Sequence, residues 1–335
     1  MLKNHHNEVR VGLLGFGTVG QGLVQGINLQ LNNISARLGA QLKIQRALVQ
    51  DTNKKRVVGL AELTTDAGDI LEDPDIDIVV EVMGGEQPAY AYIKQALGQR
   101  KQVVTANKLL LAIHGPELKA LALRNGKDLL YEGSVLGGIP ILRTIQRGLC
   151  GDKVEEVKGI FNGTTNFILT RMVELGEDYS TALRLAQQAG YAEADPTMDV
   201  SGLDAACKLV ILCRECFDLA FHLKDVTMSG IEHLEQRQIV LEKAQGRIPK
   251  LIACANPRKG EMNVGVEWLS DTDLLSRVSG VQNALSLKTL LAGELFWSGP
   301  GAGGLATGGA VLGDIIEAAE RILLERGTAF QQTGR

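Results

Sequence analysis

Four carboxylates and one lysine lie close together in the stretch Gly190–Lys208, which reads GYAEADPTMDVSGLDAACK. The acids are Glu193, Asp195, Asp199 and Asp204, and the lysine is Lys208. Pro196 disfavours regular structure directly after Asp195, so the first two acids are expected on a loop. From the second glycine of the stretch onward, apolar residues recur at steps of three and four. This pattern predicts a helix with Asp204 and Lys208 one turn apart on the same face.

This acid–lysine pair has two interpretations. As an exposed ion pair it would contribute only about 0.3–0.5 kcal/mol to stability. As a partly buried pair, its lysine would be poised beside carboxylates to donate a proton to a substrate carbonyl. The apolar residues around the pair favour burial, but the local pattern leaves both interpretations open.

A glycine motif follows the first predicted strand. The sequence VRVGLLGFGTVGQGLVQGI, from Val9, predicts a strand, a G-x-G-x-x-G turn and an amphipathic helix, which is the arrangement that binds dinucleotides. Gly15 would allow the tight turn, Gly17 the approach of a pyrophosphate, and Gly20 close packing of helix on strand. The cofactor contacts predicted in this motif are Gly15, Phe16, Gly17, Thr18, Val19 and Gly20.

The end of the next predicted strand, Leu42–Val49, bears on the choice between NAD and NADP. An acid at this position holds the adenosine ribose hydroxyls, whereas a basic residue accepts a 2′-phosphate. Here neutral Gln50 is followed by acidic Asp51 and by a basic run at residues 54–56. The sequence therefore predicts NAD or NADP, with Gln50 as a contact and the preference open.

Strands and helices alternate through the first 140 residues. We predict strands over Ile76–Gly85, Gln102–Lys108 and Asp128–Glu132, and a helix over Tyr90–Leu97. Alternation with right-handed crossovers gives a doubly wound parallel sheet of the Rossmann α/β type. Ligands bind beyond the carboxyl ends of such strands, so Lys108 is expected over the cofactor.

The pattern changes after Pro140. We predict helices over Ile141–Leu149, from Thr165 and over Ser180–Gly190, and strands over Lys153–Phe161 and within Val240–Trp297. A final glycine loop precedes a long helix. We therefore predict a nucleotide-binding domain over residues 1–135 and a second, mixed α+β domain over 136–298. A loop and helix over 299–335 are expected to return to the first domain.

Composition narrows the class of protein. Of the 335 residues, 45% are apolar and 22% charged, as in ordinary soluble globular proteins. A net charge of −4 argues against non-specific binding to nucleic acid or to an anionic membrane surface. No segment has the apolar length of a membrane span, and the N-terminus lacks the apolar core of a secretory signal. We expect a cytoplasmic protein with a small-molecule partner.

The five cysteines are expected to be reduced thiols, because no export signal is present. Cys213 and Cys216 have the C-x-x-C spacing of metal ligands, but no second pair or histidine set completes a zinc site. We therefore interpret them as small buried hydrophobic residues within a helix.

Six sequence blocks together resemble the homoserine dehydrogenase family over nearly the whole chain. They are GFGTVGQG (15–22), TANK (105–108), YEGSVLGGIP (131–140), NGTTNFILT (162–170), GYAEADPTMDVSGLDAACK (190–208) and GPGAGGLATGGAV (299–311). The order and spacing of these blocks make the resemblance specific. The long acid–lysine block is its strongest part, because a generic Rossmann protein would not reproduce it.

The resemblance implies roles for single residues. Lys208 is the implied acid that protonates the substrate oxygen, and Lys108 is a second candidate for that role. The implied substrate contacts are Glu193, Asp204, Asp199 and Gly190, and further cofactor contacts are Gly84, Lys108 and Gly303. A monovalent-cation site is implied at Glu132, Val135, Gly137 and Ile139. One carboxylate and backbone carbonyls suit a hard cation such as sodium.

The implied reaction is the reversible NAD(P)H-dependent reduction of L-aspartate 4-semialdehyde to L-homoserine, in the aspartate route to threonine and methionine. The resemblance also implies that residues 136–298 form the substrate-binding and dimerisation domain of a homodimer. Two positions depart from the family pattern: Gln50 stands where NADP-preferring relatives often carry arginine, and Leu136 is bulky for its glycine loop. With nothing after residue 335 to form the regulatory domain of longer relatives, we expect a short form without threonine feedback through such a domain.

Two alternatives are weaker. An acylating semialdehyde dehydrogenase needs an activated cysteine, and neither Cys150 nor Cys207 has an obvious histidine partner. A non-catalytic nucleotide sensor on the same fold is the other alternative. The presence of Lys108 and Lys208 together with the substrate carboxylates argues against it.

Overall fold

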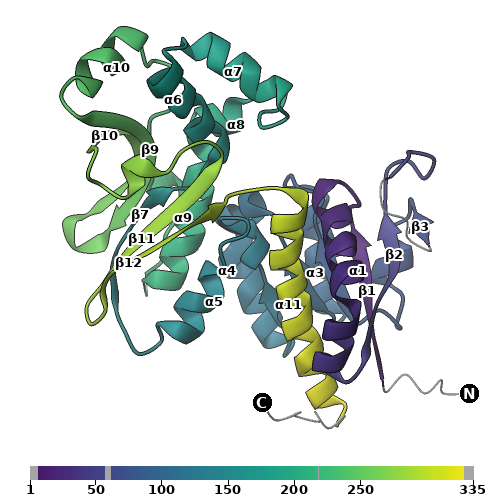
Figure 1. Cartoon of the computed structure of the whole chain (residues 1–335). Helices are drawn as coiled ribbons and strands as arrows, with labels where there is room; N and C mark the ends of the chain where they lie inside the picture. The colour runs from purple at the N-terminus through teal and green to yellow at the C-terminus, as the bar shows by residue number, and fades with distance from the viewer. Residues whose placement is uncertain (1–6, 57–61, 218, 328–335) are drawn as a thin grey trace, which may run out of the picture. The chain divides into compact units, whose positions relative to one another are not determined.

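A computed structural model describes residues 7–56, 62–217 and 219–327 of the chain. The contacts divide the chain into two units, one formed by residues 1–134 and 303–335 and the other by residues 135–302 (Figure 1). The ends of the predicted first and last parts, residues 1–6 and 328–335, lie outside the described residues. The roles predicted for the parts of the chain remain predictions.

The first unit is built on a six-stranded parallel sheet with the strand order β3-β2-β1-β4-β5-β6. Its strands are β1 (Glu8–Leu14), β2 (Gln41–Leu48), β3 (Leu63–Thr64), β4 (Ile78–Glu81), β5 (Gln102–Thr105) and β6 (Leu129–Leu130). Central β4 reads IVVE and is buried throughout, as expected for a parallel strand covered on both faces. This strand order is that of dinucleotide-binding folds, so the predicted Rossmann sheet is confirmed.

Helices flank this sheet. They are α1 (Thr18–Leu38), α2 (Gly68–Leu71), α3 (Ala89–Gly98), α4 (Lys108–Arg124) and α11 (Gly304–Glu325), with a 3-10 turn at Glu132–Ser134. Figure 1 shows α1 and α11 side by side. Gly308 makes this contact close, because a Cβ there would lie 2.5 Å from the Leu23 nitrogen. Part of the C-terminal glycine cluster therefore serves the packing of α11 against α1.

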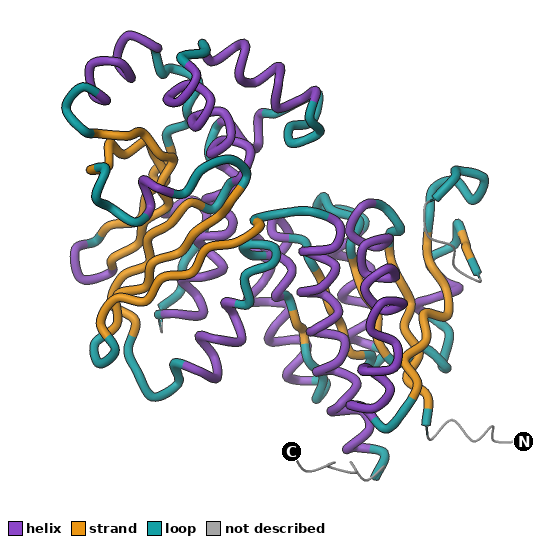
Figure 2. The backbone as a smooth tube through the Cα atoms, viewed as in Figure 1, coloured by secondary structure: helices purple, strands orange, loops and turns teal. Residues whose placement is uncertain are grey.

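The second unit contains a mixed sheet with the order β12-β11-β7-β9-β10-β8, in which only β8 and β10 pair in parallel. Its strands are β7 (Val154–Ile160), β8 (Thr227–Met228), β9 (Arg247–Asn256), β10 (Glu261–Ser270), β11 (Gln282–Thr289) and β12 (Gly293–Pro300). Figure 2 shows these strands running alongside the helices of the unit. The predicted α+β character of this region is confirmed.

The helices of the second unit carry Asp199 and Asp204, two of the four residues predicted to bind substrate. They are α5 (Ile141–Arg143), which continues as a π-helix over Thr144–Gly148, α6 (Gly163–Leu175), α7 (Tyr179–Gln188), α8 (Thr197–Val200), α9 (Leu203–Cys216) and α10 (Gln236–Lys243). Short 3-10 turns lie at Leu223–Asp225, Pro257–Lys259 and Leu275–Arg277. Among these helices, α6 and α9 contact β9 and thereby fix the acid–lysine stretch to the sheet.

Two predicted boundaries are wrong. The strand predicted over Gln102–Lys108 ends at Thr105, because the Asn107 side chain accepts a hydrogen bond from the Leu110 N–H and caps α4. The strand region predicted from Val240 begins only at Arg247, since Val240 lies in α10. The apolar run there was too short to separate a helix from a strand by its pattern.

In the described part of the chain, no helix is both long and apolar enough to cross a membrane.

Candidate active site

The glycine motif after β1 has the backbone that a dinucleotide site needs. Gly15 has a φ of 104°, a conformation that favours glycine. A Cβ on Gly20 would lie 2.8 Å from the Gly15 carbonyl oxygen, so only glycine allows α1 to begin this close to the turn. The space beside Gly17 is open, with no atom within 4 Å of where its Cβ would stand. This geometry fits the three glycine roles predicted from the sequence.

The carboxyl ends of four parallel strands lie in register at one edge of the sheet. Leu14 pairs with both Leu48 and Glu81, and Glu81 pairs with Thr105. The predicted contacts follow within three residues of these ends: Gly15 after β1, Gln50 after β2, Gly84 after β4 and Lys108 after β5. Gln50 is exposed and Lys108 is half-buried at the first position of α4. The sheet therefore brings these predicted cofactor contacts to one edge.

The C-terminal glycine loop reaches the same edge. Gly303 has a φ of 126° and precedes α11. The next residue, Gly304, lies against the start of α1, because a Cβ on it would stand 2.9 Å from the Thr18 carbonyl oxygen. Gly303 is thus adjacent to a residue that touches the glycine motif, which supports its place among the predicted contacts.

Glu81 is a buried acid at this edge that the sequence analysis missed. Its carboxylate accepts hydrogen bonds from the Met83 N–H at 2.8 Å, the Gly84 N–H at 3.1 Å and the Thr105 hydroxyl at 2.6 Å. Burial raises the pKa of Glu81, and these hydrogen bonds offset part of that shift. The Glu81 side chain thereby holds the turn that contains Gly84. The sequence does carry one sign of this role, because Glu81 is an acid at the end of an otherwise apolar strand.

The acid–lysine pair of the second unit is buried. Lys208 Nζ lies 2.8 Å from Asp204 Oδ2 and donates a second hydrogen bond to the Phe161 carbonyl oxygen at 2.6 Å. Only 2% of Asp204 and 8% of Lys208 is exposed. The predicted helix is confirmed as α9, and the interpretation as an exposed ion pair is wrong.

Asn162, which we did not predict, joins two of the predicted acids. Its Nδ2 donates to Asp199 Oδ1 at 2.7 Å and to Asp204 Oδ2 at 2.8 Å. Asp199 lies in α8, a short helix that the sequence analysis also missed. This amide therefore joins Asp199 to Asp204, and Asp204 in turn binds Lys208.

The other acids of the stretch lie on an exposed loop, as predicted. Asp195 accepts from the Thr197 N–H and hydroxyl, which lower the pKa of its carboxyl. Glu193 is exposed, and in the described residues no hydrogen bond joins its carboxylate to the buried cluster. Gly190 has a φ of 75° and ends α7, so it turns the chain into this loop.

The predicted cation loop contains two successive residues in the left-handed region. Leu136 has a φ of 53° and Gly137 a φ of 55°. A Cβ on Gly137 would lie 2.5 Å from the Gly301 carbonyl oxygen, so two backbone segments approach closely here. Leu136 is fully buried, which explains why a bulky residue stands in the loop. Glu132, three residues before Val135, is 2% exposed, and its N–H donates to Asp314 Oδ2.

The C-x-x-C cysteines lie in α9, as predicted, where burial raises the pKa of both thiols. A thiol with a raised pKa is a poor metal ligand at neutral pH. Across the described residues, no cluster of three or more His, Cys, Asp and Glu side chains could hold a metal ion.

Two family models match this chain. The model described as homoserine dehydrogenase, NAD binding domain, covers residues 15–132, and the model described as homoserine dehydrogenase covers residues 140–316. The chain belongs to the homoserine dehydrogenase family. The resemblance stated from the six sequence blocks is confirmed.

Relatives support this assignment over most of the chain. The homoserine dehydrogenase of Bacillus subtilis is 44% identical over 312 residues, which are 92% of this chain and 72% of the relative. The crystal structure of a homoserine dehydrogenase from Thiobacillus denitrificans superposes with a TM-score of 0.92 at 36% identity, covering 96% of this chain and 75% of that one. A hyperthermophilic archaeal homoserine dehydrogenase in complex with NADPH superposes with a TM-score of 0.78 at 28% identity, covering 94% and 98% of the two chains.

Proposed function

We propose that this chain catalyses the reversible reduction of L-aspartate 4-semialdehyde to L-homoserine with a nicotinamide cofactor. The observation that carries this proposal is the buried Asp204–Lys208 pair within a chain of the homoserine dehydrogenase family. A buried ammonium held by a carboxylate suits a reaction in which negative charge develops on a carbonyl oxygen.

Lys208 is the proposed proton donor. Asp204 and the Phe161 carbonyl oxygen fix the position of its ammonium group. The ammonium would stabilise the developing alkoxide and then transfer a proton from Nζ to that oxygen. In the direction of homoserine oxidation, the same amine accepts the hydroxyl proton. Lys108 remains the second candidate, since it begins α4 at the edge where the cofactor contacts gather.

The substrate's amino and hydroxyl groups are proposed to be held by Glu193, Asp199, Asp204 and Gly190. Orientation matters here, because positioning of the reacting groups supplies much of the acceleration of such transfers. The exposed Glu193 carboxylate suits the substrate ammonium, and buried Asp204 suits a group next to Lys208.

The first unit is proposed to hold the cofactor on the glycine motif, with Gly84, Lys108 and Gly303 as further contacts. When bound, the nicotinamide supplies or accepts the hydride. The open space beside Gly17 and the N-terminus of α1 suit the pyrophosphate.

Arg56 favours NADP as the preferred cofactor. Its guanidinium donates to the carbonyl oxygens of Lys54 and Asp51 at 2.8 and 2.9 Å, and it lies 5.8 Å from the centre of the Phe16 ring. These contacts hold an arginine beside the glycine motif and next to the end of β2, where a 2′-phosphate is read. We therefore propose NADP, with neutral Gln50 leaving NAD as an accepted second cofactor.

A monovalent cation, sodium, is proposed at Glu132, Val135, Gly137 and Ile139. The donors would be oxygen atoms, and the tight turn at Leu136 and Gly137 crowds backbone carbonyls together, which suits a hard cation. We further propose a homodimer formed by the second unit and a cytoplasmic role in threonine and methionine biosynthesis. Both follow the family, and sedimentation of the purified protein tests the dimer.

The test is nicotinamide absorbance at about 340 nm with purified protein, homoserine and either NAD or NADP. We expect homoserine-dependent reduction of both cofactors, loss of turnover in Lys208→Ala, and retained cofactor binding in that variant. Turnover lost in Lys108→Ala but retained in Lys208→Ala would transfer the proton-donor role to Lys108. A folded protein that binds cofactor but does not oxidise homoserine would contradict the proposed reaction.

A further inference from the structure

Asn162 makes four hydrogen bonds through one side-chain amide. Its Oδ1 accepts from the Thr165 N–H at 2.7 Å and from the Thr165 hydroxyl at 3.0 Å. Its Nδ2 donates to Asp199 Oδ1 at 2.7 Å and to Asp204 Oδ2 at 2.8 Å. The side chain is 4% exposed, so these bonds form away from bulk water.

The orientation of this amide is fixed by its partners. The backbone N–H of Thr165 can only donate, so it must face Oδ1. The two ionised carboxylates can only accept, so they must face Nδ2. A flipped amide would place oxygen against oxygen on one side and N–H against N–H on the other. The bridge to the acids is therefore a consequence of the neighbouring groups.

The backbone directly before Asn162 also binds Lys208. The carbonyl oxygen of Phe161, the preceding residue, accepts from Lys208 Nζ at 2.6 Å and from Asn283 Nδ2 at 3.2 Å. Residues 161 and 162 thus bind the ammonium through the backbone and both acids through a side chain. Asp204 Oδ2 accepts from Lys208 and Asn162 together, at 2.8 Å each.

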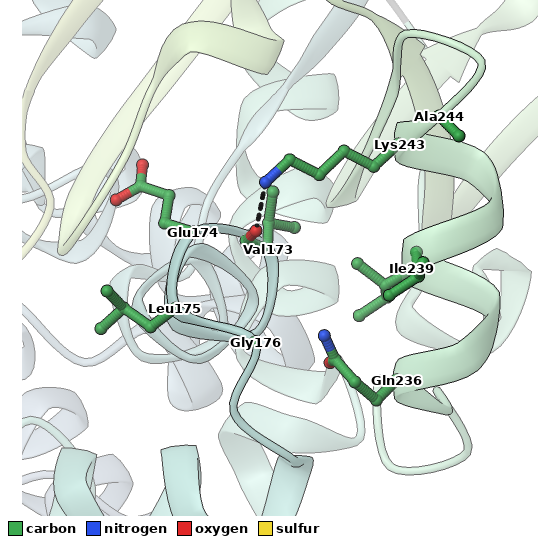
Figure 3. Close-up of a pocket in the computed structure, with 9 residues that line it drawn as sticks. Val173, Glu174, Leu175, Gly176, Gln236, Ile239, Lys243 and Ala244 are labelled. Atoms are coloured by element: carbon green, nitrogen blue, oxygen red, sulfur yellow. Dashed lines mark hydrogen bonds between the residues drawn. The ribbon is translucent and has the colours of Figure 1, made fainter.

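Helix α6, which Asn162 caps, is tied to the sheet along its length. The Asn166 amide, one turn on, donates to the carbonyls of Val278 and Gln282 and accepts from Lys250 Nζ. At the C-terminal end of α6, Lys243 of α10 donates a hydrogen bond from Nζ to the Val173 carbonyl oxygen at 2.7 Å (Figure 3). These contacts fix the helix and hence the direction in which Asn162 points its amide.

The pocket in Figure 3, between the end of α6 and α10, contains no residue predicted for the active site. It is lined by Val173–Gly176 and by residues of α10 together with Ala244. The polar groups of Gln236 and Lys243 that line it donate to carbonyl oxygens in the last turn of α6 and so cap that helix.

Without a donor between them, two adjacent carboxylates would repel each other, and one would turn away or take up a proton. The Asn162 amide prevents this because each carboxylate receives an N–H bond. Asp204 is thereby directed at Lys208, while Asp199 is held one residue before α8 ends.

We propose that Asn162 is a positioning residue for this reaction, setting the orientation of Asp199 and Asp204 beside Lys208. This inference rests on the proposed function, because the two acids are proposed substrate contacts. Asn162 itself transfers no proton and forms no bond to the substrate in this account.

Two substitutions separate positioning from helix capping. Asn162→Ser and Asn162→Asp both keep an oxygen that can accept from the Thr165 N–H, so both preserve the cap of α6. The serine variant weakens the bridge, and the aspartate variant replaces it with a third carboxylate. Asn256→Asp is the matched control, because Asn256 also caps a helical turn and donates to a carboxylate, that of Glu156, at 2.8 Å.

We expect thermal unfolding of Asn162→Ser and Asn256→Asp to stay close to that of the parent protein. The melting temperature of Asn162→Asp should fall, because its new carboxylate is buried against two others. For homoserine oxidation we expect kcat/KM to fall about ten- to a hundredfold in Asn162→Ser and further in Asn162→Asp. Asn256→Asp should retain the parent value. Cofactor binding should be unchanged in all three, since the lost bonds concern only the acids.

The pH dependence of activity in Asn162→Asp distinguishes a positioning role of residue 162 from a purely structural one. A protonated aspartic acid at position 162 carries an O–H donor and can restore the bridge to Asp199 or Asp204, with Lys208 still facing Asp204. The activity of Asn162→Asp relative to Asn162→Ser should therefore rise as the pH falls from about 9 to about 6. Full activity in both variants, with an active parent, would overturn the inference. An inactive parent would instead contradict the proposed function.

Discussion

Asp204 and Lys208 lie one turn apart in α9, with Oδ2 and Nζ separated by 2.8 Å and both side chains buried. An ion pair in this environment differs from the surface pair that its spacing alone would describe. Breaking a buried pair leaves an uncompensated charge, which costs several kcal/mol, whereas breaking a surface pair costs little. The same burial gives the lysine a defined position for proton transfer.

Lys208→Met should lower both the turnover and the stability of the protein. We expect kcat to fall by about 10²–10⁴-fold, as for loss of a general acid, and the free energy of unfolding to fall by roughly 3–5 kcal/mol. The stability loss arises because Asp204 is left charged and buried. Steady-state kinetics and urea unfolding measure the two effects.

The double variant Lys208→Met/Asp204→Asn separates these effects. Neutralising Asp204 should recover much of the lost stability but none of the turnover. Lys158→Met is the control, since Lys158 pairs with Glu267 at 2.7 Å and is only partly buried. It should keep full turnover and lose less than about 1 kcal/mol. Recovery of turnover in the double variant would argue against Lys208 as the proton donor.

Local patterns predicted the first unit well. The glycine motif, the apolar strands and their alternation with helices each follow from short segments, so the parallel sheet and the edge carrying Gly15, Gly84 and Lys108 were foreseen. Glu81 was missed because its importance depends on its pairing with Thr105, on a strand 24 residues away. Such pairing is visible only when both strands are in place.

The acid–lysine stretch shows a similar limit. Its spacing predicted the helix and the shared face of Asp204 and Lys208, but their burial depends on the packing of α9 against β7 and β9. Asn162 lay within a block quoted for its resemblance, yet its side chain meets Asp199 and Asp204 only through the fold. Hydrogen bonds between residues about 40 positions apart leave no periodic signal in the sequence.

Arg56→Ala should change the cofactor preference. A guanidinium that binds a 2′-phosphate contributes roughly 1.5–3 kcal/mol, so kcat/KM for NADP should fall about ten- to a hundredfold. The value for NAD should change little, because NAD carries no phosphate at that position. Initial rates with each cofactor at saturating homoserine measure the ratio.

Lys55→Ala is the matched control for this prediction, since Lys55 is exposed and adjacent. It should leave the NADP to NAD ratio near the parent value. An equal loss with both cofactors in Arg56→Ala would show that the arginine supports Phe16 and the glycine motif rather than the phosphate.

Gly308→Ala should destabilise the packing of α11 on α1. The new Cβ would lie 2.5 Å from the Leu23 nitrogen, so the helices must separate, at a cost of about 1–3 kcal/mol. Gly309→Ala is its control, because no atom lies within 4 Å of the Cβ position there. That variant should gain roughly 0.5–1 kcal/mol from the better helix propensity of alanine. Thermal unfolding measures both, and equal shifts would contradict the close helix contact.

Lys250→Met should change how stability depends on pH. Lys250 is 3% exposed, and its Nζ donates to Asn166 Oδ1 at 3.0 Å and to the Val278 carbonyl. Burial lowers the pKa of Lys250 from 10.5 to about 8. Between these values the unfolded chain binds a proton that the folded protein has released. The free energy of unfolding should therefore rise by roughly 2–3 kcal/mol as the pH increases across this window.

Methionine cannot titrate, so this rise should disappear in Lys250→Met. Its free energy of unfolding should change little between about pH 8 and pH 10 compared with the parent. Lys288→Met, at an exposed position of β11, should keep the parent slope. Urea unfolding at several pH values measures all three proteins. If the parent shows no rise over this window, the ammonium of Lys250 retains its proton when buried and its two carbonyl oxygen acceptors compensate for the loss of water.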